Sequence, residues 1–299
     1  MESQGCARKP DFDAAKLSSM KEMETGEKDM GKTDMEKTDT GKTDIGKTEM
    51  EKTGTGKTNK GNINKGKGRE GRGLQLVLGL ALAVFIIALS ATAGLNLRGI
   101  YSADIDRYGL TDISGLSKER LEENFRVLVD YNNIWGAKEL DFPDFPMSEH
   151  GRIHFEEVKR IFCGLQLAGI ISAVVIAAYV ASVMAKYDKS GKTTRRAASD
   201  LRFLKYGAMM VIIIPAVLGG AIAINWDMAF VVFHKLLFRN DYWLFDLETD
   251  PVITVLPDQF FMHVALVMIG VALLSCAVCL VAYIRLRHDP SSLKLCRNE

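Results

Sequence analysis

Four long apolar segments constrain the fold of this chain more than any other feature of its sequence. They cover residues 74–95, 161–185, 207–224 and 260–284, and none of them contains Asp, Glu, Lys or Arg. A hydrocarbon core about 30 Å thick is crossed by about 20 helical residues. Pro215 interrupts the third segment, which a membrane helix tolerates when its neighbours satisfy the freed carbonyl group. The sequence therefore predicts an all-α membrane protein with four transmembrane helices.

The first apolar segment has an alternative interpretation as a secretory signal peptide. Ala91, Thr92 and Ala93 have the small-x-small form of a cleavage site. The segment is longer than the apolar region of a signal peptide, and a long polar region precedes it. These features favour a retained transmembrane helix.

The polar segments between the apolar ones differ in charge, and this difference predicts the orientation. Residues 186–206 contain seven basic and two acidic side chains, and the segments just before the first helix and after the last one are also mainly basic. Residues 96–160 contain nine basic and 13 acidic side chains, and residues 225–259 contain two and six. Basic segments stay on the cytoplasmic side of a membrane. We therefore predict cytoplasmic termini and a small extracytoplasmic cap formed by residues 96–160 and 225–259.

The amino-terminal region has a composition that cannot support a folded core. Residues 31–60 repeat a five-residue unit of the GKTDM type and contain no aromatic side chain. We predict a disordered, repeat-containing cytoplasmic tail over residues 1–73, a membrane domain with its cap over residues 74–285, and a short cytoplasmic tail over residues 286–299. Residues 41–48 match the phosphate-loop pattern only through the repeat, and no strand pattern precedes them. We expect neither a nucleotide nor a nucleic acid as a partner.

Three helices are expected in or next to the cap. Residues 117–132 carry apolar side chains at helical spacing, with Ser117 as the N-cap. A second helix begins near Met147 and continues through Lys159 into the second apolar segment. Residues 229–238 form an apolar segment suited to a helix that lies at the membrane surface.

Histidine is the residue type best suited to carry chemistry in this cap, because its side chain exchanges a proton near neutral pH. The chain has five: His150, His154, His234, His263 and His288. All but the last lie in the predicted cap or at its edge. One alternative is a structural role for each. Another is a zinc site, because His150 and His154 stand four residues apart, although Gly151 disfavours a helix between them.

One segment containing a histidine resembles a signature of the bacterial lipoprotein intramolecular transacylases, the Lit family. Residues 148–159, with the sequence SEHGRIHFEEVK, lead directly into the second apolar segment. They are similar to the family's His-Met-x-Asp-Val-Lys segment. Phe155 and Glu157 depart from that pattern, in which the family has Met and Asp.

A second segment resembles the other signature of the same family. Residues 233–243, with the sequence FHKLLFRNDYW, begin this match. The match continues through Asp246 and Asp250 to LPDQFF at residues 256–261. The resemblance as a whole covers roughly residues 74–284.

The resemblance implies four membrane helices, an extracytoplasmic cap and a defined reaction. The family acts on a lipoprotein whose amino-terminal cysteine carries a thioether-linked diacylglyceryl group. It moves the sn-2 acyl chain from glycerol to the cysteine α-amine, which gives the lyso-form lipoprotein. The family's two catalytic histidines correspond to His154 and His234. Diacylated lipoproteins in the outer leaflet and membrane lipids are the implied partners, and no cofactor or metal is expected.

Further residues near the two histidines are candidates for orienting them or for closing the cap. They are Glu157, Lys159, Asn240, Trp243 and Asp246. The alternative for each is a capping or interfacial role. For the whole chain, the alternative function is a non-catalytic membrane scaffold in which the histidines only pack in the cap. A transporter is disfavoured, because no Asp, Glu, Lys or Arg lies in the apolar segments.

Overall fold

The computed structural model describes residues 61–190 and 200–288. The expectations for the five-residue repeat and for the end of the chain fall outside the described residues. Contacts along the chain divide it into two units, Met1–Gly68 and Arg69–Glu299. The side chains discussed below all belong to the second unit.

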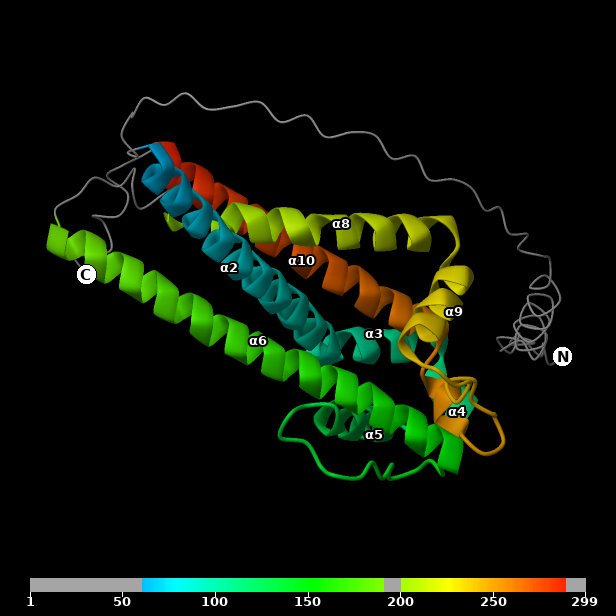
Figure 1. Cartoon of the computed structure of the whole chain (residues 1–299). Helices are drawn as coiled ribbons and strands as arrows, with labels where there is room; N and C mark the ends of the chain where they lie inside the picture. Colours follow the sequence, from blue (N-terminus) through cyan, green and yellow to red (C-terminus); the bar gives the residue numbers. More distant parts are fainter. Residues whose placement is uncertain (1–60, 191–199, 289–299) are drawn as a thin grey trace, which may run out of the picture. The chain divides into compact units, whose positions relative to one another are not determined.

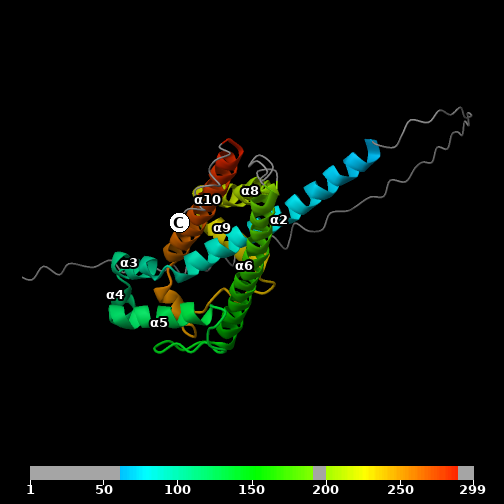
Figure 2. The same cartoon turned by 90° about the vertical axis from the view of Figure 1, so that its left-hand side faces the viewer.

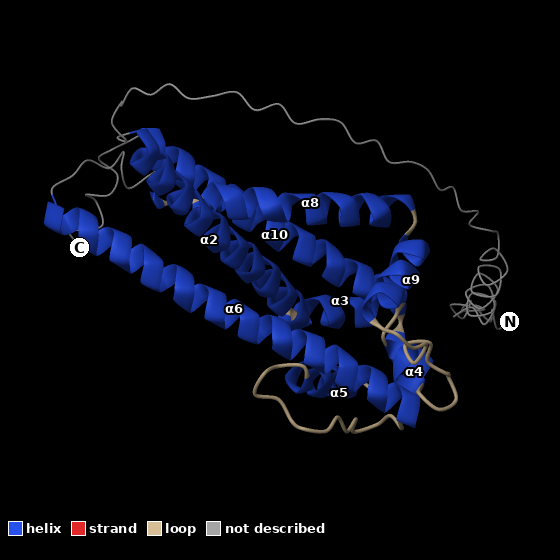
Figure 3. Cartoon of the chain, viewed as in Figure 1, coloured by secondary structure: helices blue, strands red, loops and turns tan. Residues whose placement is uncertain are grey.

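Four long helices have the length and apolar composition needed to cross a membrane (Figure 1). They are α2 (Gly61–Asn96), α6 (Glu149–Ser190), α8 (Phe203–Ile224) and α10 (Asp258–His288). Helices, turns and loops make up the rest of the described residues (Figure 3). The predicted all-α membrane protein with four transmembrane helices is confirmed. Because α2 begins at Gly61, the predicted boundary at residue 73 between tail and membrane domain lies inside this helix.

Glycines allow α2 and α8 to approach each other closely. A Cβ added to Gly79 would lie 2.9 Å from the Cβ of Tyr206, and one added to Gly207 would lie 2.8 Å from the Cβ of Leu82. Small residues at such positions let the backbones of membrane helices come together. On its other side α8 lies along α10, as Figures 1 and 2 show. The three helices therefore form one packed unit.

A buried amide joins these helices to α6. Gln75 of α2 donates from Nε2 to the hydroxyl of Tyr179 on α6 at 2.8 Å and to the carbonyl oxygen of Asp200 at 2.9 Å. Its Oε1 accepts from the backbone N–H of Phe203, where α8 begins, at 2.9 Å. A buried polar side chain is stable in an apolar surrounding when its donors and acceptors are paired. Gln75 therefore fixes how the ends of three membrane helices meet.

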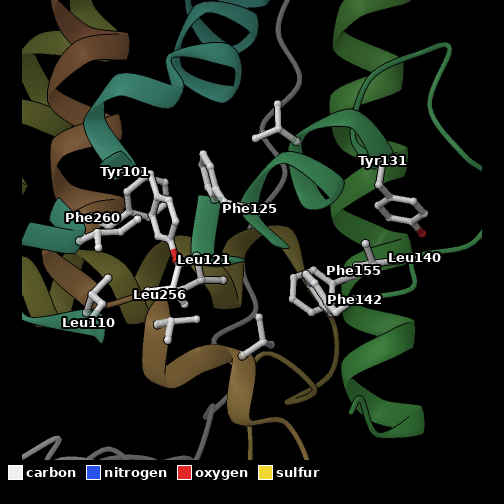
Figure 4. Packing of buried hydrophobic residues seen from close by; sticks show 14 residues of the cluster. Tyr101, Leu110, Leu121, Phe125, Tyr131, Leu140, Phe142, Phe155, Leu256 and Phe260 are labelled. Atoms are coloured by element: carbon white, nitrogen blue, oxygen red, sulfur yellow. The ribbon is translucent and has the colours of Figure 1, made fainter. Parts of the chain in front are cut away.

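We call the described segments 97–148 and 225–257 the cap. It contains α3 (Arg98–Tyr108), α4 (Leu110–Ser114), α5 (Lys118–Tyr131), α9 (Trp226–Leu237) and η1 (Pro251–Val255). Tyr101 of α3 stacks on Phe125 of α5 with ring centroids 4.1 Å apart. Both rings meet the edge of Phe260 on α10, at 5.5 and 5.3 Å (Figure 4). This aromatic core attaches the cap to the membrane helices.

The predicted helix at residues 117–132 is confirmed as α5, and the Ser117 hydroxyl accepts from the backbone N–H of Arg120 at 3.4 Å. The predicted helix at residues 229–238 is confirmed as α9, which begins slightly earlier. The sequence did not predict α3, α4 or η1. Both α3 and α4 end at a glycine in the left-handed conformation, Gly109 with φ of 62° and Gly115 with φ of 71°, which only glycine adopts without strain.

Candidate active site

His154 lies near the start of α6, where the cap fixes the helix end. The backbone N–H of Ser148 donates to Oδ1 of Asp250 at 2.7 Å, and the Ser148 hydroxyl accepts from the N–H of Gly151 at 3.0 Å. These two acceptors satisfy amides that the first turn of a helix leaves unpaired. His154 lies in the second turn of the helix and is buried. The helix end that carries His154 is thus held by a residue from the second cap segment.

The predicted helix from about Met147 through Lys159 is confirmed as the start of α6, which runs through Gly151 despite the low helix propensity of glycine. A Cβ added at this position would collide with Oδ1 of Asp250. Glycine is therefore required for the close approach of the capping carboxylate. Asp250 belongs to the second signature, but nothing in the sequence indicated that its side chain caps α6.

His234 lies in the last turn of α9. The side chain of Asn225 caps this helix by accepting from the N–H of Met228 at 2.9 Å. Nδ1 of His234 lies 2.8 Å from the carbonyl oxygen of Phe230, one turn earlier. A carbonyl oxygen only accepts, so Nδ1 carries the proton and the lone pair of the neutral ring is on Nε2. His234 is therefore held in a tautomer that can take a proton at Nε2.

The two histidines meet where α6 and α9 approach each other. Their ring centroids are 6.1 Å apart, with 35° between the ring planes. Aromatic side chains surround the pair: Phe238 and Phe245 contact His154 at 4.7 and 5.4 Å, and Phe230 and Trp243 contact His234 at 4.1 and 4.7 Å. The contact brings α6 and α9 together although 80 residues separate the two histidines in sequence. The pair is thus enclosed by rings from α6, α9 and the segment that follows α9.

The aromatic surroundings control the protonation of His234. Burial lowers the pKa of His234, while the hydrogen bond with the Phe230 carbonyl group and the charge of Asp258 oppose that change. Loss of hydration disfavours the charged form of an imidazole. His234 is therefore disposed to act in its neutral form, as a base requires.

Two buried atoms at this site have no hydrogen-bond partner among the described residues: Nδ1 of His154 and Nε1 of Trp243. Trp243 stacks on His234 with 27° between the ring planes. The predicted supporting residue Trp243 is therefore in direct contact with the pair.

A polar contact near the pair connects α6 to the segment after α9. The side-chain amide of Asn240 donates to both carboxylate oxygens of Glu157, at 3.0 and 3.2 Å. The Oδ1 atom of Asn240 accepts from the backbone N–H of Tyr242 at 3.1 Å. Glu157 stands one turn after His154 on α6. Two of the predicted supporting residues thus join the helix of one histidine to the turn that follows the other.

The remaining two predicted supporting residues have their contacts elsewhere. Lys159 donates to the carbonyl oxygen of Ala137 and lies over the ring of Tyr131, 4.1 Å from its centroid. Asp246 accepts from the backbone N–H of Glu248 at 2.8 Å. Lys159 therefore connects α6 to the end of α5, and Asp246 stabilises a turn on the path to η1.

Two other histidines have partners of a different kind. His150 is exposed and its ring stacks on Tyr242 at 4.2 Å, with 13° between the planes. Nδ1 of His263 on α10 lies 2.9 Å from Oδ2 of Asp104, a buried residue of α3. The sequence analysis missed the contact with Asp104, which joins residues 159 positions apart.

The chain is similar in sequence to one known family. It matches the family described as lipoprotein intramolecular transacylase Lit over residues 76–261. No curated protein matches the chain.

Solved structures of a membrane-integral protein from Bacillus cereus are similar to this chain. The lipoprotein intramolecular transacylase Lit from that organism has 32% sequence identity and a TM-score of 0.65, and the match covers 78% of this chain and 100% of that one. Two variants of it, with histidine-to-arginine and histidine-to-alanine mutations, have 32% identity and TM-scores of 0.63 and 0.61. Those matches cover 76% and 80% of this chain, and 96% and 100% of the others. The resemblance predicted from the two signatures is confirmed, and the chain belongs to the Lit family of lipoprotein intramolecular transacylases.

Proposed function

We propose that this chain moves the sn-2 acyl group of a diacylglyceryl-cysteine lipoprotein from the glycerol oxygen to the α-amine of the same cysteine. The product is a lyso-form lipoprotein with an amide-linked acyl chain. The observation that carries this proposal is the His154–His234 pair, enclosed by aromatic rings at the junction of α6 and α9. Membership of the Lit family and the similarity to the Bacillus cereus transacylase support the reaction class.

The chemistry begins with the nucleophile. An α-amine has a pKa of about 7.7–8.0 and must lose a proton to form a stable amide. Its nitrogen attacks the sn-2 carbonyl carbon, and the carbonyl electron pair moves to the oxygen. His234 takes the amine proton at Nε2, the ring nitrogen left free by the hydrogen bond of Nδ1 to Phe230. We therefore assign the role of general base to His234.

The second histidine completes the proton transfer. When the carbonyl group re-forms, the bond between the acyl carbon and the glycerol oxygen breaks, and this oxygen needs a proton. The ring centroids are 6.1 Å apart, which is too far for a direct hydrogen bond between the rings. A group of the substrate or a water molecule therefore relays the proton from His234 to one ring nitrogen of His154, and His154 donates the proton of its other nitrogen to the glycerol oxygen. Both rings end neutral, which suits a buried, aromatic surrounding. Ester and amine are consumed, and amide and alcohol are formed, without any other reactant.

Positioning accounts for much of the remaining catalysis. Ester and amine belong to the same substrate, so the protein has to bring them together in one reactive conformation. Such orientation contributes about 7–11 kcal/mol to lowering a barrier. Aromatic walls such as Phe238 and Phe245 exclude water and so disfavour hydrolysis of the ester.

The proposed location follows from the charges of the connecting segments. We place the cap on the outer side of the plasma membrane and both termini in the cytoplasm, with diacylated lipoproteins of the outer leaflet as substrates and membrane lipids around the helices. Asp112 and Asp246 are exposed positions in the two cap segments. Cysteines introduced there should react with an impermeant reagent in intact cells. Reaction only after lysis would contradict this orientation.

The reaction is tested by co-expressing the chain with a reporter lipoprotein in a host that makes diacylated lipoproteins. Substrate and product are isomers, so the intact mass of the amino-terminal peptide does not distinguish them. Fragmentation in the mass spectrometer should show an acyl chain on the α-amine only when the chain is present. A scaffold would leave the acyl chain on the glycerol, and that outcome would contradict the proposal.

A further inference from the structure

Trp243 is a buried hydrogen-bond donor without an acceptor. Its side chain is 7% exposed, and its indole nitrogen has no partner among the described residues. Burying a polar group usually requires a hydrogen bond, and a native exception calls for an explanation. The stack of Trp243 on His234 explains why an aromatic residue stands at this position. It does not explain why that residue carries an N–H, because phenylalanine would stack as well.

Half of the buried side-chain nitrogen and oxygen atoms that have no partner among the described residues lie at this site. The whole set is Oδ1 of Asn132, Nδ1 of His154, Nε1 of Trp226 and Nε1 of Trp243. Two of these four, in His154 and Trp243, belong to rings that contact His234 directly, at 6.1 and 4.7 Å. Two unpaired groups next to the proposed base indicate a site that pairs with a polar ligand.

The chemistry of the indole restricts what that ligand can be. An indole N–H donates and does not accept, so it requires an acceptor and excludes the substrate's ammonium group. Within a diacylglyceryl-cysteine, the acceptor that gains negative charge during the reaction is the sn-2 carbonyl oxygen. A donor already aimed at such an oxygen in a water-poor site stabilises the transition state more than the substrate.

We infer that the indole N–H of Trp243 binds the sn-2 carbonyl oxygen and stabilises the oxyanion formed when the amine attacks. This inference rests on the proposed function. The N–H bond is neither formed nor broken in the reaction, so the balance of atoms is unchanged. His234 and His154 are then free to handle the proton alone, and Trp243 is a third catalytic residue.

The test compares Trp243→Phe with Trp226→Phe. Both variants lose a buried, unpaired indole N–H, but Trp226 contacts Phe230 and not a histidine of the pair. We expect Trp243→Phe to lower kcat by about 100-fold, as for loss of an oxyanion donor, with little change in KM and in thermal stability. Trp226→Phe should stay within about twofold of the unmodified chain, because it removes no contact with the reacting atoms. Nearly full kcat in Trp243→Phe would overturn the inference.

A binding measurement separates the oxyanion role from packing. A phosphonate at the sn-2 position imitates the tetrahedral, anionic intermediate, whereas an ether at the same position lacks the carbonyl oxygen. Trp243→Phe should weaken phosphonate binding by at least about tenfold and leave ether binding unchanged. Equal weakening of both ligands would show a packing role and overturn the inference.

A second variant tests the inference if Trp243→Phe does not fold. Benzothienylalanine introduced at position 243 keeps the size and stacking of the indole but replaces its N–H by sulfur. It should reproduce the loss of kcat, and full activity would overturn the inference. Activity of the unmodified chain separates the two proposals: if it forms amide and the Trp243 variants do so equally well, only the inference fails. If it forms none, the proposed function fails and the inference fails with it.

Discussion

His154, His234 and His263 lie in two different surroundings. His263 on α10 is held by the buried carboxylate of Asp104, which also lies 3.8 Å from the guanidinium group of Arg107. His154 and His234 are enclosed by aromatic rings that provide no charge. A carboxylate fixes an imidazole by a strong, directional contact, whereas an aromatic enclosure leaves a neutral ring free to exchange a proton. The comparison supports a structural role for His263 and agrees with the chemical role that we propose for the pair.

Substitution of the pair should have the largest effect. His154→Ala and His234→Ala should each lower the rate of acyl transfer by at least about 10²-fold, the low end for loss of general acid–base catalysis. His→Gln at either position should be nearly as damaging, because glutamine hydrogen-bonds but does not take a proton near neutral pH. The measurement is the fraction of reporter lipoprotein with an acylated α-amine, at matched protein levels in the membrane. Full activity of either alanine variant would show that the histidine in the aromatic enclosure has no chemical role, and the proposed difference from His263 would be lost.

The contact between Glu157 and Asn240 should have the next largest effect. Asn240→Asp places a carboxylate against the carboxylate of Glu157, which would push α6 away from the turn after α9. A displacement of the paired rings should lower kcat by about tenfold.

The same contact provides its own control. Adding Glu157→Gln to Asn240→Asp restores a donor and an acceptor in reversed order, so the double variant should recover most of the activity. Recovery of activity in the double variant would depend on the restored hydrogen bonds between positions 157 and 240, and not on the stability of the folded protein as a whole. An equal loss in the single and the double variant would show that the contact does not position the histidines.

His263→Ala should affect stability rather than chemistry. Asp104 would remain buried without its histidine partner, and loss of one partner from a buried hydrogen bond costs about 2 kcal/mol. We expect a lower midpoint of thermal unfolding in detergent, while kcat per folded molecule stays within about threefold, because His263 makes no contact with the pair. Asp104→Asn, which keeps a hydrogen-bonding side chain, should lower the midpoint less. A loss of kcat like that of His154→Ala would contradict the structural role of His263.

The protonation of His234 gives a smaller and more direct measure of its surroundings. Burial lowers the pKa of His234 below its ordinary value of 6.5. In protein labelled with ¹³C at the histidine ring carbon Cε1, the NMR signal that disappears in His234→Gln should titrate with a midpoint below 6.5. The unfolded chain would take up a proton near pH 6.5 that the folded chain does not, so stability should decrease as the pH falls through this range. A midpoint above 6.5 would contradict the effect of burial on His234.

Some of these features could be predicted from sequence because they depend on neighbouring residues. The four spans follow from uninterrupted apolar composition over enough residues. The α5 helix follows from helical spacing and a capping residue, and α9 follows from a short apolar segment suited to the membrane surface. His154 and His234 were predicted because each lies inside a contiguous signature. These signals are local, so folding does not alter them.

Other features depend on contacts between distant parts of the chain, and the sequence contains no local sign of them. Asp104 reaches His263 only after α3 has packed on α10. Asp250 caps α6 from 102 residues beyond Ser148, and this contact is the reason for a glycine at position 151. The aromatic enclosure likewise combines α6 with Phe230 of α9 and with Phe245 beyond it. Long-range packing decided each of these contacts.

His150→Ala should have the smallest effect. His150 stands one turn before His154 on α6, but it is exposed and stacks on Tyr242. Loss of an exposed aromatic contact costs about 0.5 kcal/mol, so kcat should not differ measurably from that of the unmodified chain. The assay is the same acylated fraction, with His154→Ala measured beside it and with a chelator present and absent. A zinc site shared by these two histidines would instead make His150→Ala as damaging as His154→Ala and would stop the reaction when the chelator is added, since both ligands are needed to hold the metal. These two results together would show that His150 acts with His154 and His234. They would contradict the proposal that only the histidines in the aromatic enclosure take part in the reaction.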